Sequence, residues 1–404
     1  MTVTTEEREQ QRETGAATAG VAAAGIADIA DGRGYLRVAG YRRSPGDIPL
    51  TSALVRQYGL RKGDQVAGTA APRQGQGQGR ARDRARDGSR NGNAGGSPGM
   101  TLVSVESING VPPGAAKARP RFDDLTPVYP NQRFRLEDGD SGATARIIDL
   151  ISPIGKGQRG LIVAPPKAGK TMVLKTIAHA IGAAYPQVHL MLVLVGERPE
   201  EVTDLRRSVR GEVISSTFDQ SPDEHVLAAE LAIERAKRLA ELGRDVVVLL
   251  DSLTRLGRAY NLAAPASSRT LTGGVAASAL QPPRQFLGAA RCLEEGGSLT
   301  IMSTALIDTG SQLDNVLFEE FKGTGNMELR LRRDLAEKRM FPAIDVAPSG
   351  TRREDLLMEP AEHAAVVSLR RALAALDPQH ALELLLDKTI HPNEQFLRQI
   401  RQSR

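Results

Sequence analysis

The sequence is short of two things that would change its class: cysteine and long hydrophobic runs. The single cysteine, Cys292, excludes an intramolecular disulfide framework and indicates a reducing compartment. Its neighbours, from Gly288 to Leu293, predict a small residue on a packed helix. The longest apolar run, around Leu190–Val195, has the length of a strand and falls well short of the ~20 residues of a membrane-spanning helix. Since the first residues are acidic and lack the apolar core of a signal peptide, we expect a cytoplasmic protein with no membrane partner.

A strong excess of one charge is also absent. Lys and Arg number 53 against 48 Asp and Glu, so the formal net charge is only +5, although abundant arginine raises the pI to about 9.4. This balance is compatible with a nucleic-acid partner without requiring one. With 404 residues, 40% of them apolar, the chain is long enough for two or three domains with a sizeable core.

The first third of the chain has the pattern of a small β-rich unit. Short apolar stretches such as Gly34–Val38 and Ile48–Leu50 are separated by the turn formers Gly, Pro and Asp. Between residues 72 and 99 this pattern breaks, because six arginines and two aspartates stand among Gly and Gln without a large aliphatic residue. A strand-like segment resumes at Met100–Val105, which predicts a flexible basic insertion between two strands. The insertion is either a phosphate-attracting arm or a solvated linker. We expect a disordered tail over 1–20, a β-rich domain over 21–112 containing the insertion 72–99, a linker over 113–140 and a larger domain over 141–404.

From about Arg146 onward, short apolar runs alternate with helix-like stretches. The runs are of the kind found in strands buried on both faces of a parallel sheet. A helical pattern covers Asp223–Glu241, and the end of the chain from Glu359 predicts short helices punctuated by Pro378 and Pro392. The alternation predicts right-handed β-α-β crossovers and a doubly wound α/β domain. The clearest strand candidates are 160–164, 188–195, 246–250 and 299–303.

A phosphate-binding loop follows the first of these strands. The segment Ala164–Thr171 reads Ala-Pro-Pro-Lys-Ala-Gly-Lys-Thr and precedes a helical stretch, as the G-x-x-x-x-G-K-[ST] pattern requires, although Ala164 replaces its first glycine. Gly169 allows backbone amides to approach phosphates closely, the Lys170 ammonium reaches the outer phosphates, and the Thr171 hydroxyl ligates Mg²⁺. The loop therefore predicts ATP and Mg²⁺ as cofactors.

Two acidic residues stand at the ends of other predicted strands. Asp251 ends the run 246–250, where open α/β sheets place their ligands and where a carboxylate holds magnesium directly or through water. Glu197 follows the run 188–195, from which a carboxylate can orient or deprotonate the attacking water. Either residue alone would be an ordinary strand-end charge, but the two beside a phosphate-binding loop favour a nucleotide-hydrolysing site.

Six segments of the sequence together resemble bacterial transcription termination factor Rho, and the resemblance runs from about Ile147 to Leu357. It implies a RecA-like P-loop ATPase domain with a parallel sheet, preceded by a small OB-like β-barrel domain. It also implies a homo-hexamer that hydrolyses ATP in response to single-stranded RNA, moves along the nascent transcript and dissociates the RNA polymerase elongation complex. The segments are Gly160–Thr171, Gly196–Val202, Asp251–Arg255, Leu271–Val275, Phe321–Asn326 and Ser349–Arg352.

The resemblance assigns roles at the nucleotide site. Arg352 matches an arginine finger supplied by the neighbouring subunit, Arg339 lies at the same interface, and Phe341 matches an aromatic that packs on adenine. The catalytic candidates are Glu197, Lys170, Arg352, Arg339 and Arg198; the nucleotide-binding candidates are Pro166, Lys167, Ala168, Gly169, Lys170, Thr171, Met172 and Phe341; the metal ligands are Thr171 and Asp251.

The resemblance also places RNA contacts, with several departures. Two pore loops are implied, around 271–280 and 308–312, but Ala276 replaces an acidic residue and Gln312 replaces a lysine that would contact phosphate. In the amino-terminal domain Arg33 and Pro49 stand where the family has aromatic rings, and no aromatic precedes Met100, so base stacking should be weaker. The implied RNA-binding residues are Tyr35, Arg37, Asp47, Arg269, Gly273, Gly274, Val275, Gly310, Ser311 and Gln312.

Three alternatives remain open at the level of sequence. The chain could be a divergent paralogue whose ATPase regulates termination with altered RNA loading. It could be a subunit that binds ATP or RNA and modulates a partner without translocating, which the complete set of nucleotide-site residues disfavours. A rotary ATP synthase subunit shares the fold but would lack the Pro165-Pro166 loop and the RNA-binding remnant.

Overall fold

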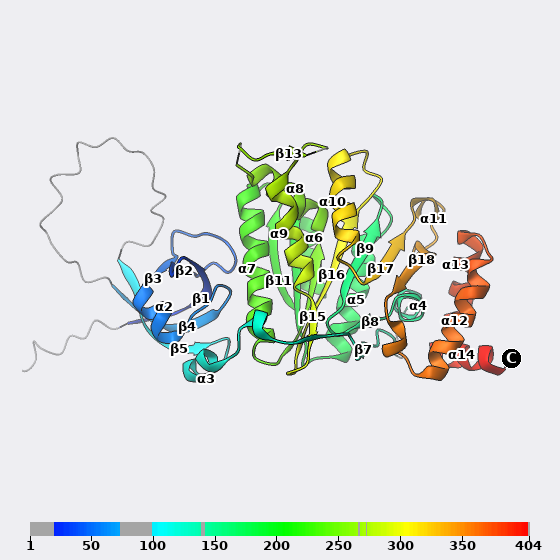
Figure 1. Ribbon diagram of the computed structural model, residues 1–404, viewed down its shortest axis with the longest axis horizontal. Coiled ribbons are helices and arrows are strands. Elements are labelled where there is room, and N and C mark those ends of the chain that lie inside the picture. The colour runs from blue at the N-terminus through cyan, green and yellow to red at the C-terminus, as the bar shows by residue number, and fades with distance from the viewer. Residues whose placement is uncertain (1–19, 73–98, 139–141, 266, 272, 403–404) are drawn as a thin grey trace, which may run out of the picture. The chain divides into compact units, whose positions relative to one another are not determined.

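The structure, a computed structural model, describes residues 20–72, 99–138, 142–265, 267–271 and 273–402 (Figure 1). The predicted disordered tail, apart from Gly20, and nearly all of the basic insertion lie outside these residues. The chain divides into two compact units at Arg119 and Pro120. No described helix is long and apolar enough to cross a membrane.

The first unit is a five-stranded antiparallel sheet in the order β3-β2-β1-β4-β5. The edge strands β3 and β5 also contact each other, so the sheet curls into a small barrel. Thr51 caps the first helix of the unit by accepting from the amide of Leu54, and Gly59 ends it in a left-handed conformation (φ 62°) that favours glycine. Its described elements are β1 (Val21–Ala30), β2 (Arg33–Arg37), β3 (Ile48–Leu50), α2 (Ser52–Tyr58), β4 (Gln65–Pro72), β5 (Met100–Ile108) and α3 (Pro113–Ala118).

The basic insertion leaves and re-enters this sheet between two paired strands. Strands β4 and β5 are antiparallel neighbours, and Pro72 stands opposite Met100 in their register. The two described ends of the predicted insertion therefore lie side by side in the sheet.

The second unit is built on a mainly parallel sheet in the order β11-β10-β12-β16-β9-β17-β18, with only β18 antiparallel to its neighbour on this path. This confirms the predicted α/β class and all four predicted central strands. The strands are β9 (Arg159–Ala164), β10 (His189–Glu197), β11 (Glu212–Thr217), β12 (Asp245–Asp251), β16 (Ser298–Leu306), β17 (Met327–Leu331) and β18 (Ile344–Thr351), with short pairs formed by β6 (Pro127–Val128), β7 (Arg133–Phe134), β8 (Ile154–Gly155), β13 (Thr270–Leu271), β14 (Val275–Ala276) and β15 (Arg291–Leu293).

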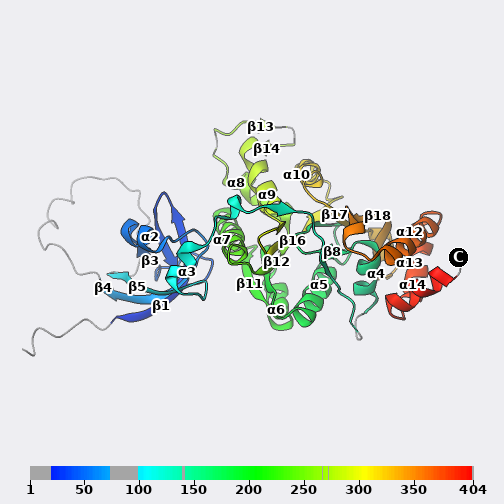
Figure 2. The same cartoon turned by 60° about the horizontal axis from the view of Figure 1, so that its bottom comes forward.

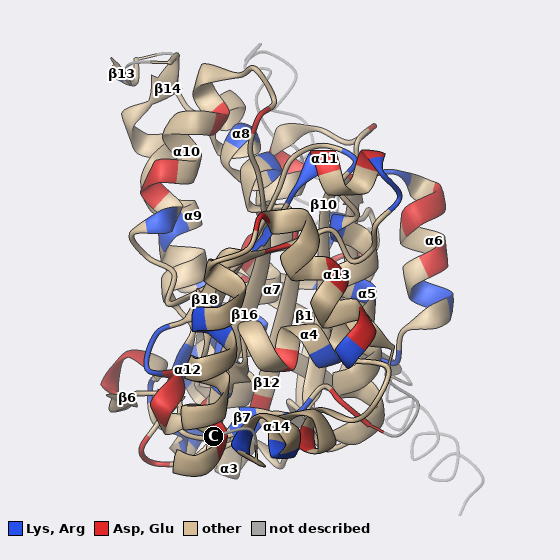
Figure 3. Ribbon diagram, turned by 90° about the vertical axis from the view of Figure 1, so that its right-hand side faces the viewer, with Lys and Arg blue, Asp and Glu red and all other residues tan. Residues whose placement is uncertain are grey.

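Helices cover both faces of this sheet. Figure 2 shows α5 and α6 on one side and α8, α9 and α10 on the other. Helix α6 has Glu200 and Glu201 in its first turn and Arg206 and Arg207 in its last, which complements the helix dipole at both ends (Figure 3). The described helices are α4 (Ala143–Ile151), α5 (Lys170–Ala184), α6 (Pro199–Ser208), α7 (Pro222–Ala240), α8 (Leu253–Ala263), α9 (Ala277–Gly288), α10 (Gln312–Lys322), α11 (Arg333–Glu337), α12 (Pro360–Ala374), α13 (Pro378–Lys388) and α14 (Asn393–Gln402), with 3-10 turns at Phe122–Asp124 and Glu354–Leu356.

The predicted helical setting of Cys292 is wrong. Helix α9 ends at Gly288, and Cys292 lies in the short strand β15, which pairs with β16 on one side and β6 on the other. The reversal between β15 and β16 uses Gly296 (φ 105°) and Gly297 (φ 80°), conformations that glycine adopts easily. Cys292 is half-buried, and burial raises the pKa of its thiol.

The segment predicted as a linker contains packed structure. Helix α3 belongs to the first unit, and in the second unit Phe122 and Leu125 are buried. The Phe122 amide donates to the buried Glu241 carboxylate at 2.8 Å, and Arg291 stacks over the Phe122 ring.

Candidate nucleotide site and RNA-facing loops

The phosphate-binding loop connects β9 to α5. Ala164 is the fully buried last residue of β9, and α5 begins at Lys170. Gly169 at the helix N-cap has φ 93°, and Lys167 also has a positive φ of 67°. These turns bring the loop directly onto the amino end of a 15-residue helix, where free N–H groups and the helix dipole favour phosphate.

Three charged side chains converge beside this loop. The Lys170 ammonium lies 2.6 Å from an Asp251 oxygen and 3.0 Å from Glu197 Oε1. Asp251 and Glu197 end the adjacent parallel strands β12 and β10, in which Leu194 stands opposite Asp251. The structure therefore brings together the phosphate-loop lysine and both predicted carboxylates, each of which is buried.

The carboxylates are also held by residues that the sequence patterns did not single out. Thr304, on β16, donates its hydroxyl to Asp251 at 2.7 Å, and Arg255, near the start of α8, pairs with Glu197 at 2.9 Å. In the sequence, only two features could have pointed to them: Thr304 directly follows the predicted strand 299–303, and Arg255 lies four residues after Asp251. Gly196, with φ 65° at a bulge in β10, turns the strand just before Glu197.

Burial and neighbouring charges shift the pKa values at this site. Burial raises the pKa of Glu197 and the Asp251 charge raises it further, while Lys170 and Arg255 oppose the shift. Burial alone would lower the pKa of Lys170, but Asp251 and Glu197 outweigh it and the net pKa is raised. A carboxylate with a raised pKa beside a permanently charged lysine is the pattern expected of a general base.

The residues at the loop fit Mg²⁺-ATP. Among the residues that the structure describes, no group of three or more Asp, Glu, His or Cys side chains could hold a metal ion. Magnesium bound with phosphates needs only one or two protein oxygens, and the Thr171 hydroxyl and the Asp251 carboxylate stay the predicted ligands. Phe341 and Met172 are 48% and 66% exposed beside the loop, and a Cβ at Gly169 would lie 3.6 Å from the Phe341 ring. This apolar surface next to the phosphate-binding loop suits an adenine base.

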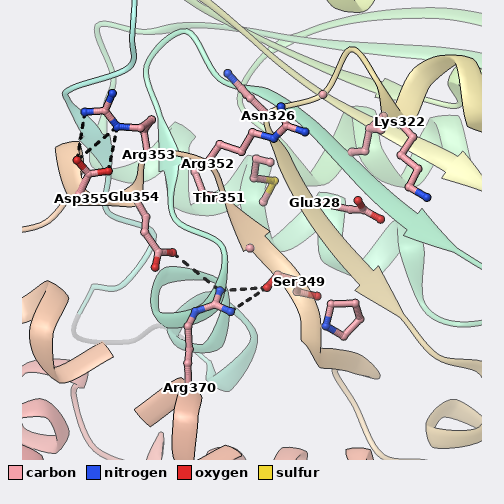
Figure 4. Close-up of a pocket in the computed structure, with 15 residues that line it drawn as sticks. Lys322, Asn326, Glu328, Ser349, Thr351, Arg352, Arg353, Glu354, Asp355 and Arg370 are labelled. Carbon is pink, nitrogen blue, oxygen red and sulfur yellow. Dashed lines mark hydrogen bonds and ion pairs between the residues drawn. The ribbon is translucent and has the colours of Figure 1, made fainter. Parts of the chain in front are cut away.

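Arg352 lies elsewhere, in a cavity of about 480 Å³ at the end of β18 (Figure 4). Lys322 and Arg353 line the same cavity, and Arg353 is paired with Asp355. Arg352 forms no ion pair with any described residue. Burial lowers the pKa of Arg159, and the charges of Arg291 and Arg352 lower it further.

The other two predicted arginines are exposed. Arg198 directly follows Glu197 and pairs loosely with Glu201 at 3.7 Å. Arg339 lies in the turn between α11 and Phe341 with φ 61°. Neither contacts the carboxylates in this arrangement, and their catalytic roles stay predictions.

The two loops expected to face RNA touch each other. Strands β13 and β14 form a hairpin whose tip contains Gly273 and Gly274, both with positive φ (80° and 75°). A Cβ at Gly273 would lie 3.2 Å from the Gln312 backbone oxygen, so the hairpin packs closely on the loop 308–312. Arg269, Gly310 and Gln312 are exposed, Ser311 caps α10, and Val275, on β14 of the hairpin, is buried.

In the first unit, two residues predicted to contact RNA, Arg37 and Asp47, are buried. Arg37 is 9% exposed and lies between Asp28, which accepts from its Nε at 3.0 Å, and Asp47, 2% exposed and 2.6 Å from its Nη1. The guanidinium also packs on the ring of Tyr35, which is 40% exposed. Asp28 was missed because it follows no motif and meets Arg37 only through the β1–β2 pairing. The cluster fixes the ring of Tyr35 at the surface of the barrel.

The fold and the loop together define a P-loop nucleotide-binding domain of the RecA-like class joined to a small β-barrel unit. Family comparison matches residues 144–351 to the nucleotide-binding domain of the ATP synthase alpha/beta family and residues 23–114 to the RNA-binding domain of Rho termination factor. The chain belongs to the Rho termination factor family.

Curated proteins similar to this chain are also Rho termination factors. The chain is 56% identical over 383 residues to transcription termination factor Rho of Streptomyces lividans, covering 94% of this chain and 52% of the relative. It is 54% identical over 382 residues to that of Streptosporangium roseum, covering 94% and 92%. The chain thus spans about half the length of the Streptomyces lividans relative. Nothing in these comparisons favours the alternative of a divergent paralogue.

Solved structures share the fold. A prototypical ATPase from the type III secretion system of pathogenic bacteria aligns with a TM-score of 0.55 at 25% identity, covering 69% of this chain and 82% of that one. The assembled ATPase EscN from the enteropathogenic E. coli type III secretion system aligns with a TM-score of 0.58 at 22% identity, covering 75% and 77%.

Proposed function

We propose that this chain is an RNA-dependent ATPase that moves along single-stranded nascent RNA and terminates transcription. The observation that carries the proposal is the buried convergence of Lys170, Glu197 and Asp251 at the phosphate-binding loop of a Rho-family chain. The working form is a homo-hexameric ring in the cytoplasm, and the RNA polymerase elongation complex is the partner that it dissociates.

The residues divide the work of hydrolysis. Bound Mg²⁺-ATP supplies the γ-phosphoryl group and the metal charge. Lys170 binds the outer phosphates, Thr171 and Asp251 hold the metal, and Glu197 takes a proton from the attacking water. Lys167, Ala168 and Gly169 cradle the phosphates through their backbone N–H groups, Pro166 shapes the loop, and Met172 and Phe341 hold the adenine. Arg352 and Arg339 serve the interface between neighbouring subunits, and Arg198, next to Glu197 in the chain, is a further catalytic candidate.

ATP turnover with and without pyrimidine-rich RNA tests the proposal. RNA should raise turnover by about 5- to 150-fold, the usual range for coupling between two sites. Lys170→Ala is the control, because it removes the phosphate-binding ammonium and should abolish both rates. Equal turnover with and without RNA in the wild-type chain would overturn the RNA-coupled function.

The exposed ring of Tyr35 should contribute most of the base stacking in the first unit. Tyr35→Ala should weaken binding of labelled oligo-C by about 5- to 150-fold, since stacking on one aromatic contributes about 1–3 kcal/mol. Because a ring carries no charge, the dependence of affinity on salt should stay the same. Filter binding across a salt series measures both quantities. Tyr35→Phe keeps the ring and should bind as the wild type does; equal affinity of the Ala variant would remove Tyr35 from the RNA site.

A further inference from the structure

One side chain, Asn261, holds the hairpin formed by β13 and β14. Its Nδ2 donates to the Gly274 carbonyl at 3.2 Å, and its Oδ1 accepts from the Ala276 amide at 2.7 Å. The amide thus bridges the tip and the returning strand of the hairpin. Each strand of the hairpin has only two residues, and an isolated pair of that length is marginal in water. The two bonds from Asn261 therefore add side-chain support to the few backbone bonds of the hairpin, such as the one from the Gly274 amide to the Leu271 carbonyl.

Asn261 belongs to the helix that begins at the nucleotide site. Helix α8 starts directly after Asp251, and its cap Ser252 accepts from the amide of Arg255. Arg255 in turn pairs with Glu197 at 2.9 Å. The eleven residues of α8 extend about 16 Å, from the carboxylates to the hairpin. Figure 1 shows the hairpin at the far end of α8 from the sheet.

A third side chain on α8 reaches the other RNA-facing loop. Arg258 donates to Asp314 at 2.8 Å and 2.5 Å, and Thr309 in the loop 308–312 donates to the same carboxylate. Residues 255, 258 and 261 are spaced three apart, so they follow one side of the helix. Helix α8 is therefore bonded to Glu197 at the nucleotide site and to the hairpin, and through Asp314 to the loop 308–312.

We propose that Asn261 is a positioning residue through which α8 sets the RNA-facing hairpin and couples it to ATP turnover. The inference rests on the proposed RNA-dependent ATPase function and goes beyond it by naming the contact that joins the two sites. If α8 moves at its Arg255 end, the hairpin moves with it because Asn261 bonds the hairpin to the helix. Without the Asn261 side-chain amide, Gly273 is no longer held against the Gln312 backbone and the hairpin adopts several conformations. RNA then binds more weakly, because only a fraction of the molecules have the hairpin in the binding conformation.

The test uses the full chain with three variants. Asn261→Ala removes both bonds. Asn261→Asp keeps the acceptor for the Ala276 amide and loses the donor to Gly274. Asn131→Ala is the matched control, because Asn131 is an exposed asparagine outside both the nucleotide site and the RNA-facing loops. Each is measured for nucleotide affinity without RNA, for the RNA concentration that gives half-maximal ATPase activation, and for hydrogen exchange of residues 270–276.

We expect Asn261→Ala to raise the half-maximal RNA concentration about 30-fold, the size of two lost hydrogen bonds of typical net strength. Nucleotide affinity should stay within about twofold of wild type, exchange over 270–276 should rise, and Asn131→Ala should match wild type. Asn261→Asp should lose at least as much RNA response as Ala, because its carboxylate faces the Gly274 carbonyl and adds a negative charge beside the RNA-facing loops. An unchanged half-maximal RNA concentration in Asn261→Ala, or an equal loss of nucleotide affinity, would overturn the inference while leaving the proposed function intact. A wild-type chain that RNA does not stimulate would overturn the proposed function and this inference with it.

Discussion

Replacing Glu197 by glutamine should lower the maximal rate of ATP hydrolysis by about 10²–10⁴-fold, the usual contribution of a positioned general base. Glutamine has nearly the same shape and can still contact Lys170 and Arg255, but its amide cannot take a proton from water. Nucleotide affinity should change little, because the phosphate-binding loop and Asp251 remain. Single-turnover hydrolysis and equilibrium nucleotide binding, measured on the same preparation, separate the two effects.

The pH profile provides the matching control. A base works only when ionised, so activity is present above the pKa of Glu197 and is lost as the pH falls through it. Since burial and the Asp251 charge raise that pKa, the acid limb should lie above the value of about 4.3 for an ordinary glutamate. The raised pKa of Lys170 keeps its ammonium charged throughout this range. If the residual activity of Glu197→Gln falls at the same acidic pH as that of the wild type, another group titrates there. That group, and not Glu197, would then be the base.

The sequence patterns identify the residues that converge at the candidate nucleotide site because most parts of this site are local in the chain. A strand, a glycine-containing loop and a helix follow one another along the chain, and strand-end carboxylates are visible as charges after apolar runs. The sheet order then brings Glu197 and Asp251 together on neighbouring strands, which no local pattern specifies.

What the patterns missed depends on contacts between distant segments. Arg37 reads as an exposed cation until the β1–β2 pairing places Asp28 beside it. Asn261 reads as an ordinary helix residue until the hairpin folds back onto α8. The small residues before Cys292 favour a helix. Gly296 and Gly297 instead reverse the chain after Cys292, so that this segment pairs with β16 as a strand. Pairing across the fold, which determines these environments, is not periodic in sequence.

Arg352 cannot reach the nucleotide of its own subunit. Its amide donates to Asn326, whose amide donates to Arg159, so Arg352 stands level with the first residue of β9. The phosphate-binding loop begins after the last residue of β9, Ala164. Five steps along a parallel strand separate the two levels by about 16 Å, more than an arginine side chain spans. An arginine without an ion pair among the described residues is therefore suited to an anion brought by another molecule, and in the proposed ring that anion would be the neighbour's ATP.

Arg352→Ala should accordingly lower ATP turnover by about 10³–10⁵-fold, as expected for loss of an arginine that stabilises transition-state charge in trans. Nucleotide binding to the isolated subunit should be unchanged. Arg353→Ala is the matched control, since Arg353 lines the same cavity but is already neutralised by Asp355, and it should retain most of the activity.

Mixing two inactive variants decides between a cis and a trans role. In rings assembled from equal amounts of Lys170→Ala and Arg352→Ala subunits, about one interface in four joins an intact Lys170 to an intact Arg352, because each heterologous interface takes one residue from each side. Turnover should therefore reappear in the mixture although neither variant alone is active, and it should rise and fall with the mixing ratio, being largest at equal amounts. If Arg352 acted within its own subunit, every subunit in the mixture would lack one of the two residues and activity would stay absent at every ratio.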